Sequence, residues 1–272
     1  MDQWLEDAIV GMIHLPPLPG APDAGEAALE GAIDRAKADA RALDAGGIDG
    51  VMIENFGDAP FYRTDVPKHT VASMTRISSA VADAISVPIG INVLRNDPIA
   101  AMSIATAVGA DYIRVNVHSG VSVTDQGIIQ GQAHETVRLR ERLNADVAIL
   151  ADVDVKHATA LGGDRSIESV AVEAVERGHA DGVICSGSAT GESTALEDLR
   201  AVRNAFDDRG IDAPVLAGSG VTPQTIEETL SVANGAIVGT ALKENGRTTA
   251  PVEKARVAEL VENVDRVRQR HQ

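Results

Sequence analysis

Eight short apolar segments rich in β-branched residues recur along the chain, and they begin 22 to 42 residues apart. They begin at Ala8, Gly50, Pro88, Tyr112, Ala148, Gly182, Pro214 and Ala236. Between them lie segments with helical periodicity, at about 26–45, 70–85, 97–108, 133–143, 167–178, 194–207, 223–232 and 251–269. Strands that alternate with helices at this spacing are typical of parallel βα units. Eight such units predict an α/β protein, a single-domain (β/α)8 or TIM barrel over residues 1–272. An open doubly wound sheet is the alternative, because strand number alone does not prove closure.

The charge balance limits the classes of partner. Twenty-four Lys and Arg against forty Asp and Glu give a net charge of −16, which disfavours nucleic acid and anionic membrane surfaces. Arginine outnumbers lysine nineteen to five and aromatics are 2%, a combination that indicates a hydrated acidic surface of halophilic type. The single Cys185 forms no internal disulfide, and no run of about 18 apolar residues predicts a membrane span. We therefore expect a cytoplasmic protein.

Polar and apolar side chains alternate late in the fourth and fifth predicted strands. The polar ones are Arg114, Asn116 and His118 in the fourth strand and Asp152, Asp154 and Lys156 in the fifth. Alternate side chains share one face of a strand, and the apolar face must meet the helices, so both trios should point into the barrel. Burying such groups is costly unless they pair, bind a metal or face a ligand. The pattern therefore favours a functional site, with an internal layer of salt bridges as the alternative.

The predicted catalytic residues are Lys156, Asp154, Asp152, Glu54 and His118. Lys156 beside Asp154 is expected to polarise a carbonyl, transfer a proton or form a Schiff base, in that order of preference. The predicted substrate-binding residues are His14, Asn92, Arg114, Asn116 and Ser186. The same carboxylates and imidazoles offer a divalent metal an oxygen-rich site, although no compact metal motif is present and the sequence requires no cofactor.

Glycine-rich turns follow the seventh and eighth predicted strands, near 218–222 and 239–242. Their predicted phosphate-binding residues are Gly218, Ser219, Gly220, Gly239 and Thr240, with Gly187 and Ser188 after the sixth strand as an extension. Glycine allows backbone amides to approach an anion closely, and barrels often bind phosphate after strands seven and eight. The P-loop motif is absent. Two long connections, 57–69 and 118–132, are expected to be lids over the site, or else ordinary loops or oligomer contacts.

Five segments resemble motifs of the BtpA family, in order and across essentially the whole chain. They are GMIHLPPLPGAP (11–22), GINVLRNDP (90–98), ADYIRVNVHSG (110–120), ADVDVKHA (151–158) and GSGVTP (218–223). The residues that match the family pattern are His14, Asn92, Arg95, Asn116, His118, Asp152, Asp154, Lys156 and Gly218. The resemblance implies a phosphate-binding barrel from a family named for photosystem I biogenesis, some members of which are associated with sugar-uptake gene clusters.

Together these patterns predict an enzyme that acts on a small phosphorylated sugar or nucleoside-derived metabolite by isomerase or aldolase/lyase chemistry. The resemblance also keeps open a non-catalytic assembly or regulatory factor, as in photosystem I biogenesis. A metabolite-binding protein without turnover is a third reading, and a homo-oligomer remains open. The acidic composition favours the metabolic role.

Overall fold

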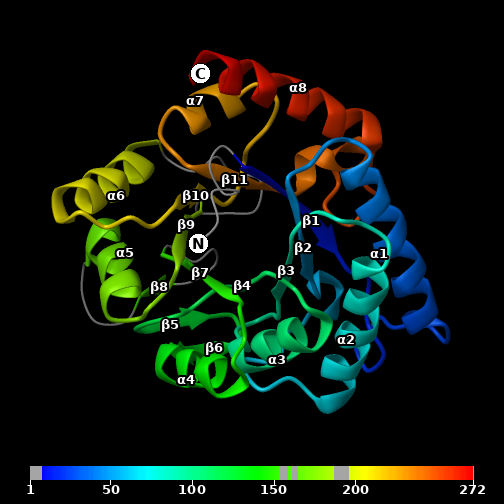
Figure 1. The fold of residues 1–272 in the computed structure, drawn as a ribbon. Helices are drawn as coiled ribbons and strands as arrows, with labels where there is room; N and C mark the ends of the chain where they lie inside the picture. Colours follow the sequence, from blue (N-terminus) through cyan, green and yellow to red (C-terminus); the bar gives the residue numbers. More distant parts are fainter. Residues whose placement is uncertain (1–7, 154–158, 161–164, 187–195, 272) are drawn as a thin grey trace.

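The computed structural model describes residues 8–153, 159–160, 165–186 and 196–271. Its centre is a closed barrel of parallel strands in the order β1-β11-β10-β9-β7-β4-β3-β2 (Figure 1). These strands are β1 (Ala8–His14), β2 (Gly50–Glu54), β3 (Ile89–Asn92), β4 (Tyr112–Val115), β7 (Ala148–Asp152), β9 (Gly182–Cys185), β10 (Val215–Ala217) and β11 (Gly235–Val238). The predicted (β/α)8 barrel is confirmed, and the open doubly wound sheet is wrong.

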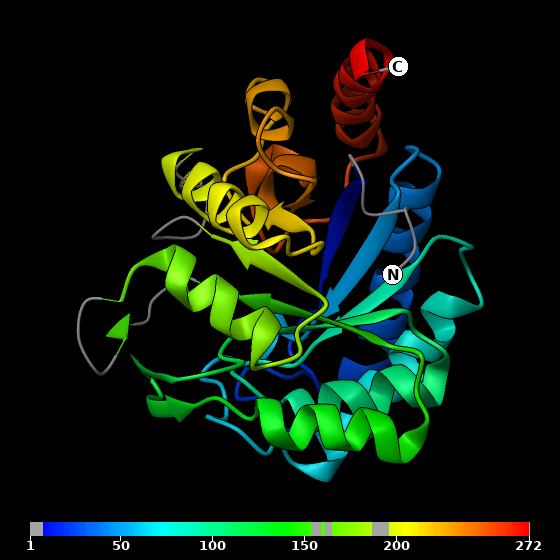
Figure 2. The same cartoon turned by 60° about the vertical axis from the view of Figure 1, so that its left-hand side comes forward.

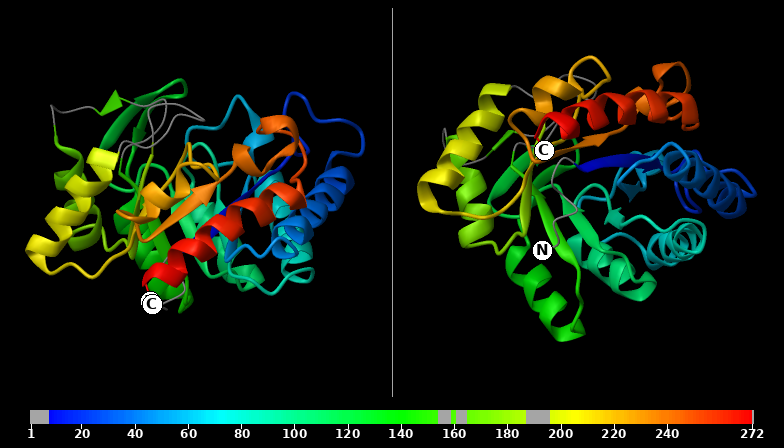
Figure 3. Two further views of the ribbon diagram at one scale, coloured as in Figure 1. Left: turned by 90° about the horizontal axis from the view of Figure 1, so that it is seen from above. Right: turned by 45° about the horizontal axis from the view of Figure 1, so that its top comes forward.

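Helices surround the barrel on its outside (Figure 3). They are α1 (Ala28–Asp44), α2 (Lys68–Ala82), α3 (Pro98–Val108), α4 (Ala133–Leu143), α5 (Ile167–Glu176), α6 (Leu196–Arg209), α7 (Ile226–Leu230) and α8 (Lys254–His271). Each predicted helical segment overlaps one of them. Helix α7 is shorter than predicted and begins at Ile226, because Thr222 and Thr225 first form a hydrogen-bonded turn. None of the described helices combines the length and the hydropathy that a membrane crossing requires.

The barrel interior is closed by apolar side chains below the carboxyl ends of the strands. This inner cluster includes Met12, Met52, Tyr112, Leu150, Ile184, Leu216 and Ile237, all buried. A Cβ at Gly90 would lie 2.1 Å from the Tyr112 ring, so the absent side chain makes room for the phenol. Burial raises the pKa of Tyr112 well above its ordinary value, and its hydroxyl donates to the carbonyl of Val51 at 2.7 Å. The interior is therefore a packed core, with space only at the rim above it.

One hydrogen-bonding arrangement occurs four times at the amino ends of the described strands. Each case involves an Asp or Asn just before one strand and a residue at the start of the neighbouring strand. The side chain of the Asp or Asn accepts the backbone N–H of that residue. The backbone N–H of the Asp or Asn donates to the carbonyl of the same residue. The pairs are Asp49 with Ile9, Asp111 with Ile89, Asp181 with Ile149 and Asn234 with Val215. The side-chain bonds are 2.8 to 2.9 Å long. We call these four pairs the lower rim.

A small antiparallel sheet lies outside the barrel, next to α4 (Figure 2). It contains the hairpin β5 (Val121–Thr124) and β6 (Gly127–Gln130), with β8 (Thr159–Ala160) paired to the other edge of β5. The sequence predicted an irregular loop over 118–132. The hairpin was missed because its strands are four residues long and partly polar, with no continuous apolar run.

Candidate active site

A cavity of about 460 Å³ opens at the carboxyl ends of the barrel strands. Its ionisable and amide side chains are His14, Glu54, Arg95, Arg114, Asn116 and Asp152. The turns after β10 and β11 complete the rim, with Ser219 and Thr240 among their lining residues. This is the rim where βα loops build the sites of such barrels. Six side chains from the sequence prediction (His14, Glu54, Arg114, Asn116, Asp152 and Ser219) therefore share one cavity with the residues of the glycine turns.

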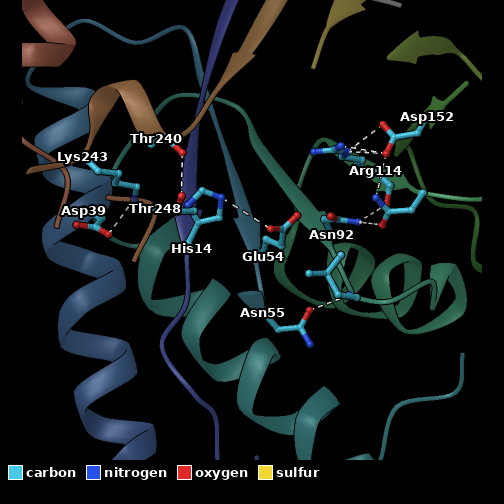
Figure 4. A network of polar contacts seen from close by, with 12 residues as sticks. His14, Asp39, Glu54, Asn55, Asn92, Arg114, Asp152, Thr240, Lys243 and Thr248 are labelled. Carbon is cyan, nitrogen blue, oxygen red and sulfur yellow. Dashed lines mark hydrogen bonds and ion pairs between the residues drawn. The ribbon is translucent and has the colours of Figure 1, made fainter. Parts of the chain in front are cut away.

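An ion pair between Arg114 and Asp152 crosses from β4 to β7 (Figure 4). The guanidinium Nη2 lies 2.9 Å from Asp152 Oδ2, and Nε lies 3.1 Å from Oδ1, so the contact is bidentate. Asn116 Nδ2 donates to the same carboxylate at 2.9 Å, and Asn92 Nδ2 donates to Asn116 Oδ1 at 3.0 Å. The four residues form one chain of polar contacts, which fixes the orientation of each side chain.

The position of Arg114 keeps it charged. Burial alone would lower its pKa, but the carboxylates of Asp152 and Glu54 outweigh that effect and raise it. Arg114 and Asp152 are 8% and 6% exposed, and both line the cavity. Both interpretations from the sequence, a functional site and an internal salt bridge, therefore apply to Arg114 and Asp152. The pair is a buried salt bridge, and it also faces the space where a ligand would lie.

His14 and Glu54 face each other at the ends of the neighbouring strands β1 and β2 (Figure 4). His14 Nε2 lies 3.8 Å from Glu54 Oε1, and both side chains are buried at the cavity wall. A Cβ at Gly239 would come within 2.9 Å of the imidazole, so glycine at this position leaves room for the His14 ring. An imidazole and a carboxylate at this separation can divide the roles of proton donor and acceptor.

The turns after β10 and β11 line the cavity with residues whose backbone amides have no acceptor among the described residues. In the described part of the chain, the N–H groups of Gly220, Val221, Thr240 and Ala241 donate to no protein oxygen, although all four residues line the cavity. Gly220 has φ of 68°, a conformation that glycine adopts without strain. Adjacent amides that point into one space form an anion-binding concavity.

Gly218 has a different role from the one predicted. Its N–H donates to the carbonyl of Cys185 at 2.7 Å, so this amide is not available to a ligand. A Cβ there would lie 2.5 Å from both Ile184 and the hydroxyl of Ser186. The glycine is needed for close packing of β10 against β9, and the turn beyond it supplies the amides.

A buried ion pair anchors the chain that follows β11. Lys243 Nζ lies 3.4 Å from Asp39 Oδ2 in α1, and the Asp39 carboxylate also accepts the N–H of Val252 at 2.8 Å (Figure 4). Burial lowers the pKa of Lys243 to about 8, an effect that the Asp39 carboxylate opposes. Thr240 and Thr248, which both line the cavity, bond to each other through their hydroxyls at 2.9 Å. The segment that carries the second amide turn is thus tied to α1.

His118 does not line the cavity to which the sequence prediction assigned it. The period-two argument fails because β4 ends at Val115, and the backbone of Val117 then bonds to the Asn96 side chain through both its N–H and its C=O. His118 is buried away from the cavity and its Nε2 lies 2.8 Å from the carbonyl of Gly178. Burial lowers its pKa, so the imidazole stays neutral.

Two predicted substrate-binding residues lie behind the cavity lining. Asn92 is 1% exposed and contacts Asn116 without lining the cavity itself. Ser186 is 4% exposed and sits against Gly218. These positions favour a role of Asn92 and Ser186 in supporting the residues that line the cavity over direct contact with a ligand.

Four predicted residues, Asp154, Lys156, Gly187 and Ser188, lie outside the described residues. Their predicted roles stay predictions. Among the residues that the structure does describe, no group of three or more His, Cys, Asp or Glu side chains is placed to hold a metal ion.

The cavity also contains residues that the site prediction left out. Phe56, Phe61 and Leu94 form one wall, and Arg95 and Thr248 add polar groups. Phe61 lies in the predicted lid 57–69, so that connection does border the site, whereas 118–132 contributes no lining residue. Arg95 stood in a family-like motif, but Thr248 lies in a connection with no sequence signal.

The family model and the curated relatives agree on one family. The chain is 45% identical over 254 residues to the photosystem I biogenesis protein BtpA of Synechocystis, covering 93% of this chain and 86% of that protein. It is 35% identical over 265 residues to the sgc region protein SgcQ of Escherichia coli, covering 97% and 96%. The structure of N-(5'-phosphoribosyl)anthranilate isomerase from Pyrococcus furiosus superposes with a TM-score of 0.57 at 12% identity, covering 96% and 100%, which is a likeness of fold. The model of the BtpA family matches residues 5–266, and the chain belongs to that family.

Proposed function

We propose that this barrel binds a small phosphorylated metabolite at its carboxyl rim and acts on it as an isomerase or a lyase. The observation that carries the proposal is the set of four backbone amides, from Gly220, Val221, Thr240 and Ala241, that border the same cavity as the His14–Glu54 pair and the Arg114–Asp152 ion pair. Backbone amides without a protein acceptor can donate hydrogen bonds to a phosphate ester. In a chain with a net charge of −16, they provide a local place for such an anion to bind.

The His14–Glu54 pair and the charged Arg114 suit a redox-neutral reaction at a carbonyl. In an isomerisation of a hydroxy-carbonyl compound, a base removes a proton from the hydroxyl-bearing carbon beside the carbonyl while an acid protonates the carbonyl oxygen, which gives an enediol. The protonated base then returns its proton to the former carbonyl carbon, and the other enediol hydroxyl gives its proton back to the conjugate base of the acid, so the carbonyl moves by one carbon and both groups are restored. Glu54 is the proposed base and His14 the proposed acid, at 3.8 Å from each other. Arg114, held by Asp152, would stabilise negative charge on the developing enediolate. No electron leaves the substrate in this sequence, so it needs no redox cofactor.

Asp154 and Lys156 keep their proposed roles from the sequence. They lie two and four residues after Asp152, which lines the cavity. In this proposal Lys156 polarises or protonates the reacting oxygen with Asp154 beside it. In a lyase reaction the same ammonium would stabilise the enolate left after the carbon–carbon bond breaks.

The phosphate part of the proposal is tested by Gly220→Asp and Gly220→Asn. Both side chains tolerate positive φ better than other residues and have nearly the same size, so the pair differs mainly in charge. Isothermal titration with ribose 5-phosphate should show binding to the wild-type protein, and at least about tenfold weaker binding to Gly220→Asp than to Gly220→Asn. Equal affinity of the two variants would place the phosphate elsewhere.

The catalytic part is tested by proton exchange. Phosphosugars that bind are incubated with the protein in D₂O, and deuterium incorporation at the carbon beside the carbonyl is followed by NMR. Glu54→Gln should slow this exchange by about 100-fold or more, while ligand affinity stays within a few fold. If every ligand binds and none exchanges or turns over, the protein is a binding or assembly factor, in line with the name of its Synechocystis relative.

A further inference from the structure

Two of the three phenylalanines in the chain line the same cavity. Aromatic residues are only 2% of the sequence, and the third, Phe206, is buried between α6 and the barrel. Phe56 and Phe61 are only partly buried and both line this cavity, and Phe61 also borders a second pocket beside Tyr62 and Leu94. An apolar ring left partly in water loses free energy of burial, which a ligand surface placed over it would recover.

These rings form one wall of the site. Phe56 follows β2, Phe61 lies farther along the same connection, and Leu94 follows β3. We call these three residues the aromatic wall. In the closed barrel β2 and β3 are neighbours, as are β10 and β11, and on the shorter way around only β1 separates the two pairs. The wall and the turns whose amides have no protein acceptor therefore lie on neighbouring sides of the mouth, with His14 at the end of β1 between them.

The segment that carries the wall is held in place before any ligand binds. Asn55 accepts the N–H of Leu94 at 2.7 Å and donates to Asp58 at 3.1 Å, and Asp58 accepts the N–H of Leu18 at 2.8 Å. These bonds tie the connection after β2 to those after β1 and β3. The ring of His14 continues the wall, with its centroid 4.9 Å from that of Phe56. A preformed apolar surface lowers the entropy cost of binding a rigid ligand.

We propose that the ligand of this site is a phosphate ester with a planar unsaturated ring at its other end, as in a nucleotide or an aryl phosphate. This inference rests on the proposed phosphate site and adds a second anchor to it. The phosphate lies on the amides after β10 and β11, and the ring packs against Phe56 and Phe61. The remaining polar lining residues, Glu54, Arg114 and Asp152, then face the part of the ligand that carries hydroxyl or carbonyl groups.

The chemistry of the lining separates this ligand from a plain phosphosugar. A short sugar phosphate would satisfy the amides and the central polar groups but would leave the phenylalanine rings uncovered. A planar π-system covers an aromatic ring at a low conformational cost, and stacking contributes enough to change affinity by tenfold or more. The cavity, at about 460 Å³, is within the range of pockets that hold organic ligands with several parts.

The test compares ligands by isothermal titration with the full chain. The probes are inorganic phosphate, ribose 5-phosphate, phenyl phosphate, uridine 5'-monophosphate, adenosine 5'-monophosphate and adenosine. We expect at least one ring-bearing phosphate to bind tenfold or more tightly than ribose 5-phosphate. Phe61→Ala and Phe61→Leu should each remove most of that advantage and change the affinity for ribose 5-phosphate by less than twofold.

The matched control is Tyr62→Ala. Tyr62 is the adjacent aromatic residue, is 53% exposed and does not line the cavity, so its loss should leave every affinity unchanged. Thermal unfolding of each variant shows that the fold is retained. If all ring-bearing phosphates bind no better than ribose 5-phosphate, or if Phe61→Ala weakens both kinds of ligand equally, the ring site is wrong.

The two proposals fail in different ways. If the ring site alone is wrong, inorganic phosphate and ribose 5-phosphate still bind and Gly220→Asp still weakens them. If the phosphate site is wrong, adenosine binds as well as its monophosphate, and Phe61→Ala weakens both. If neither adenosine nor any phosphate binds, both proposals fall.

Discussion

The two ends of the barrel use similar polar residue types in different arrangements. At the lower rim, Asp49, Asp111, Asp181 and Asn234 repeat one local arrangement, in which each carboxylate or amide accepts a backbone N–H nearby. At the upper rim, where the carboxyl ends of the strands surround the cavity, the strands end in varied side chains, and the charged ones pair with residues of neighbouring strands. Repetition indicates a structural role, because each pair closes the barrel in the same way. Variety around one cavity indicates recognition or chemistry.

The arginines at the two ends of the barrel also differ in origin and burial. At the lower rim Arg268, Arg140 and Arg203 come from the outer helices and bind acceptors already satisfied by backbone amides. At the upper rim Arg114 comes from a barrel strand and is buried beside the cavity. Replacement of Arg268, Arg140 or Arg203 should therefore affect stability only locally. Arg114 is held where its charge can act on a ligand.

The largest expected effect comes from breaking the upper-rim ion pair. Asp152→Ala leaves the Arg114 guanidinium buried without its bidentate partner and should cost about 3–5 kcal/mol of unfolding free energy, measured by urea denaturation. The double variant Arg114→Met/Asp152→Leu should recover most of that stability. If the pair serves a ligand, the double variant folds and binds no ribose 5-phosphate. A double variant that folds and binds normally would make the pair purely structural.

At the lower rim, a substitution should lower the free energy of unfolding and leave ligand affinity unchanged. Asp181→Ala removes the acceptor of the Ile149 N–H, at 2.8 Å, and should cost about 1–3 kcal/mol of stability with ligand affinity unchanged. Asp146→Ala, an exposed carboxylate two residues before β7, is the matched control and should be neutral. A large loss of affinity in Asp181→Ala would remove the distinction between the two rims.

A smaller effect concerns the ion pair behind the second amide turn. The folded pKa of Lys243 is about 8 against an ordinary 10.5, so between these values the unfolded chain binds a proton that the folded one does not. The free energy of unfolding of the wild type should therefore rise with pH in this window relative to Lys243→Met, by roughly 1–3 kcal/mol. Urea denaturation from pH 7 to 10.5 measures this. A flat or falling difference would contradict the assignment.

The smallest effect is expected at His118, which lies outside both rims. Burial lowers its pKa below 6.5, so the unfolded chain takes up a proton first as the pH falls, and stability is lost below about pH 6.5. His118→Gln should remove this acid dependence, cost less than about 1 kcal/mol at pH 7 and keep ligand affinity within about twofold. A tenfold loss of affinity would return His118 to the site.

The fold was predictable because its signal is periodic and repeated. The apolar runs at Ala8, Gly50 and Tyr112 each begin a barrel strand, since strands buried on both faces need such runs. The hairpin Val121–Gln130 was not predictable in this way, because it is stabilised by pairing within a short exposed sheet. The four lower-rim acceptors share a signal in the sequence, an Asp or Asn directly before a strand, which is visible once the pairs are known.

The charged side chains of the site were predictable where strand geometry holds, and the turn residues Ser219 and Thr240 were predictable from their glycine-rich segments. Arg114 and Asp152 point into the barrel as alternation requires, whereas His118 lies beyond the end of β4, where Asn96 redirects the backbone. The aromatic wall was missed because residues of a connection reach the cavity through tertiary bonds, such as the one from Asn55 to Leu94. No periodicity encodes contacts of this kind.

The central claim is that the undonated amides of the upper rim bind a phosphate group. A titration of ¹⁵N-labelled protein with ribose 5-phosphate, followed by amide NMR, tests it most directly. The account predicts that the amide signals of Gly220, Val221, Thr240 and Ala241 shift together with one dissociation constant, while those of Ile9, Ile89, Ile149 and Val215 stay in place. Shifts confined to other residues, or none at saturating ligand, would contradict it.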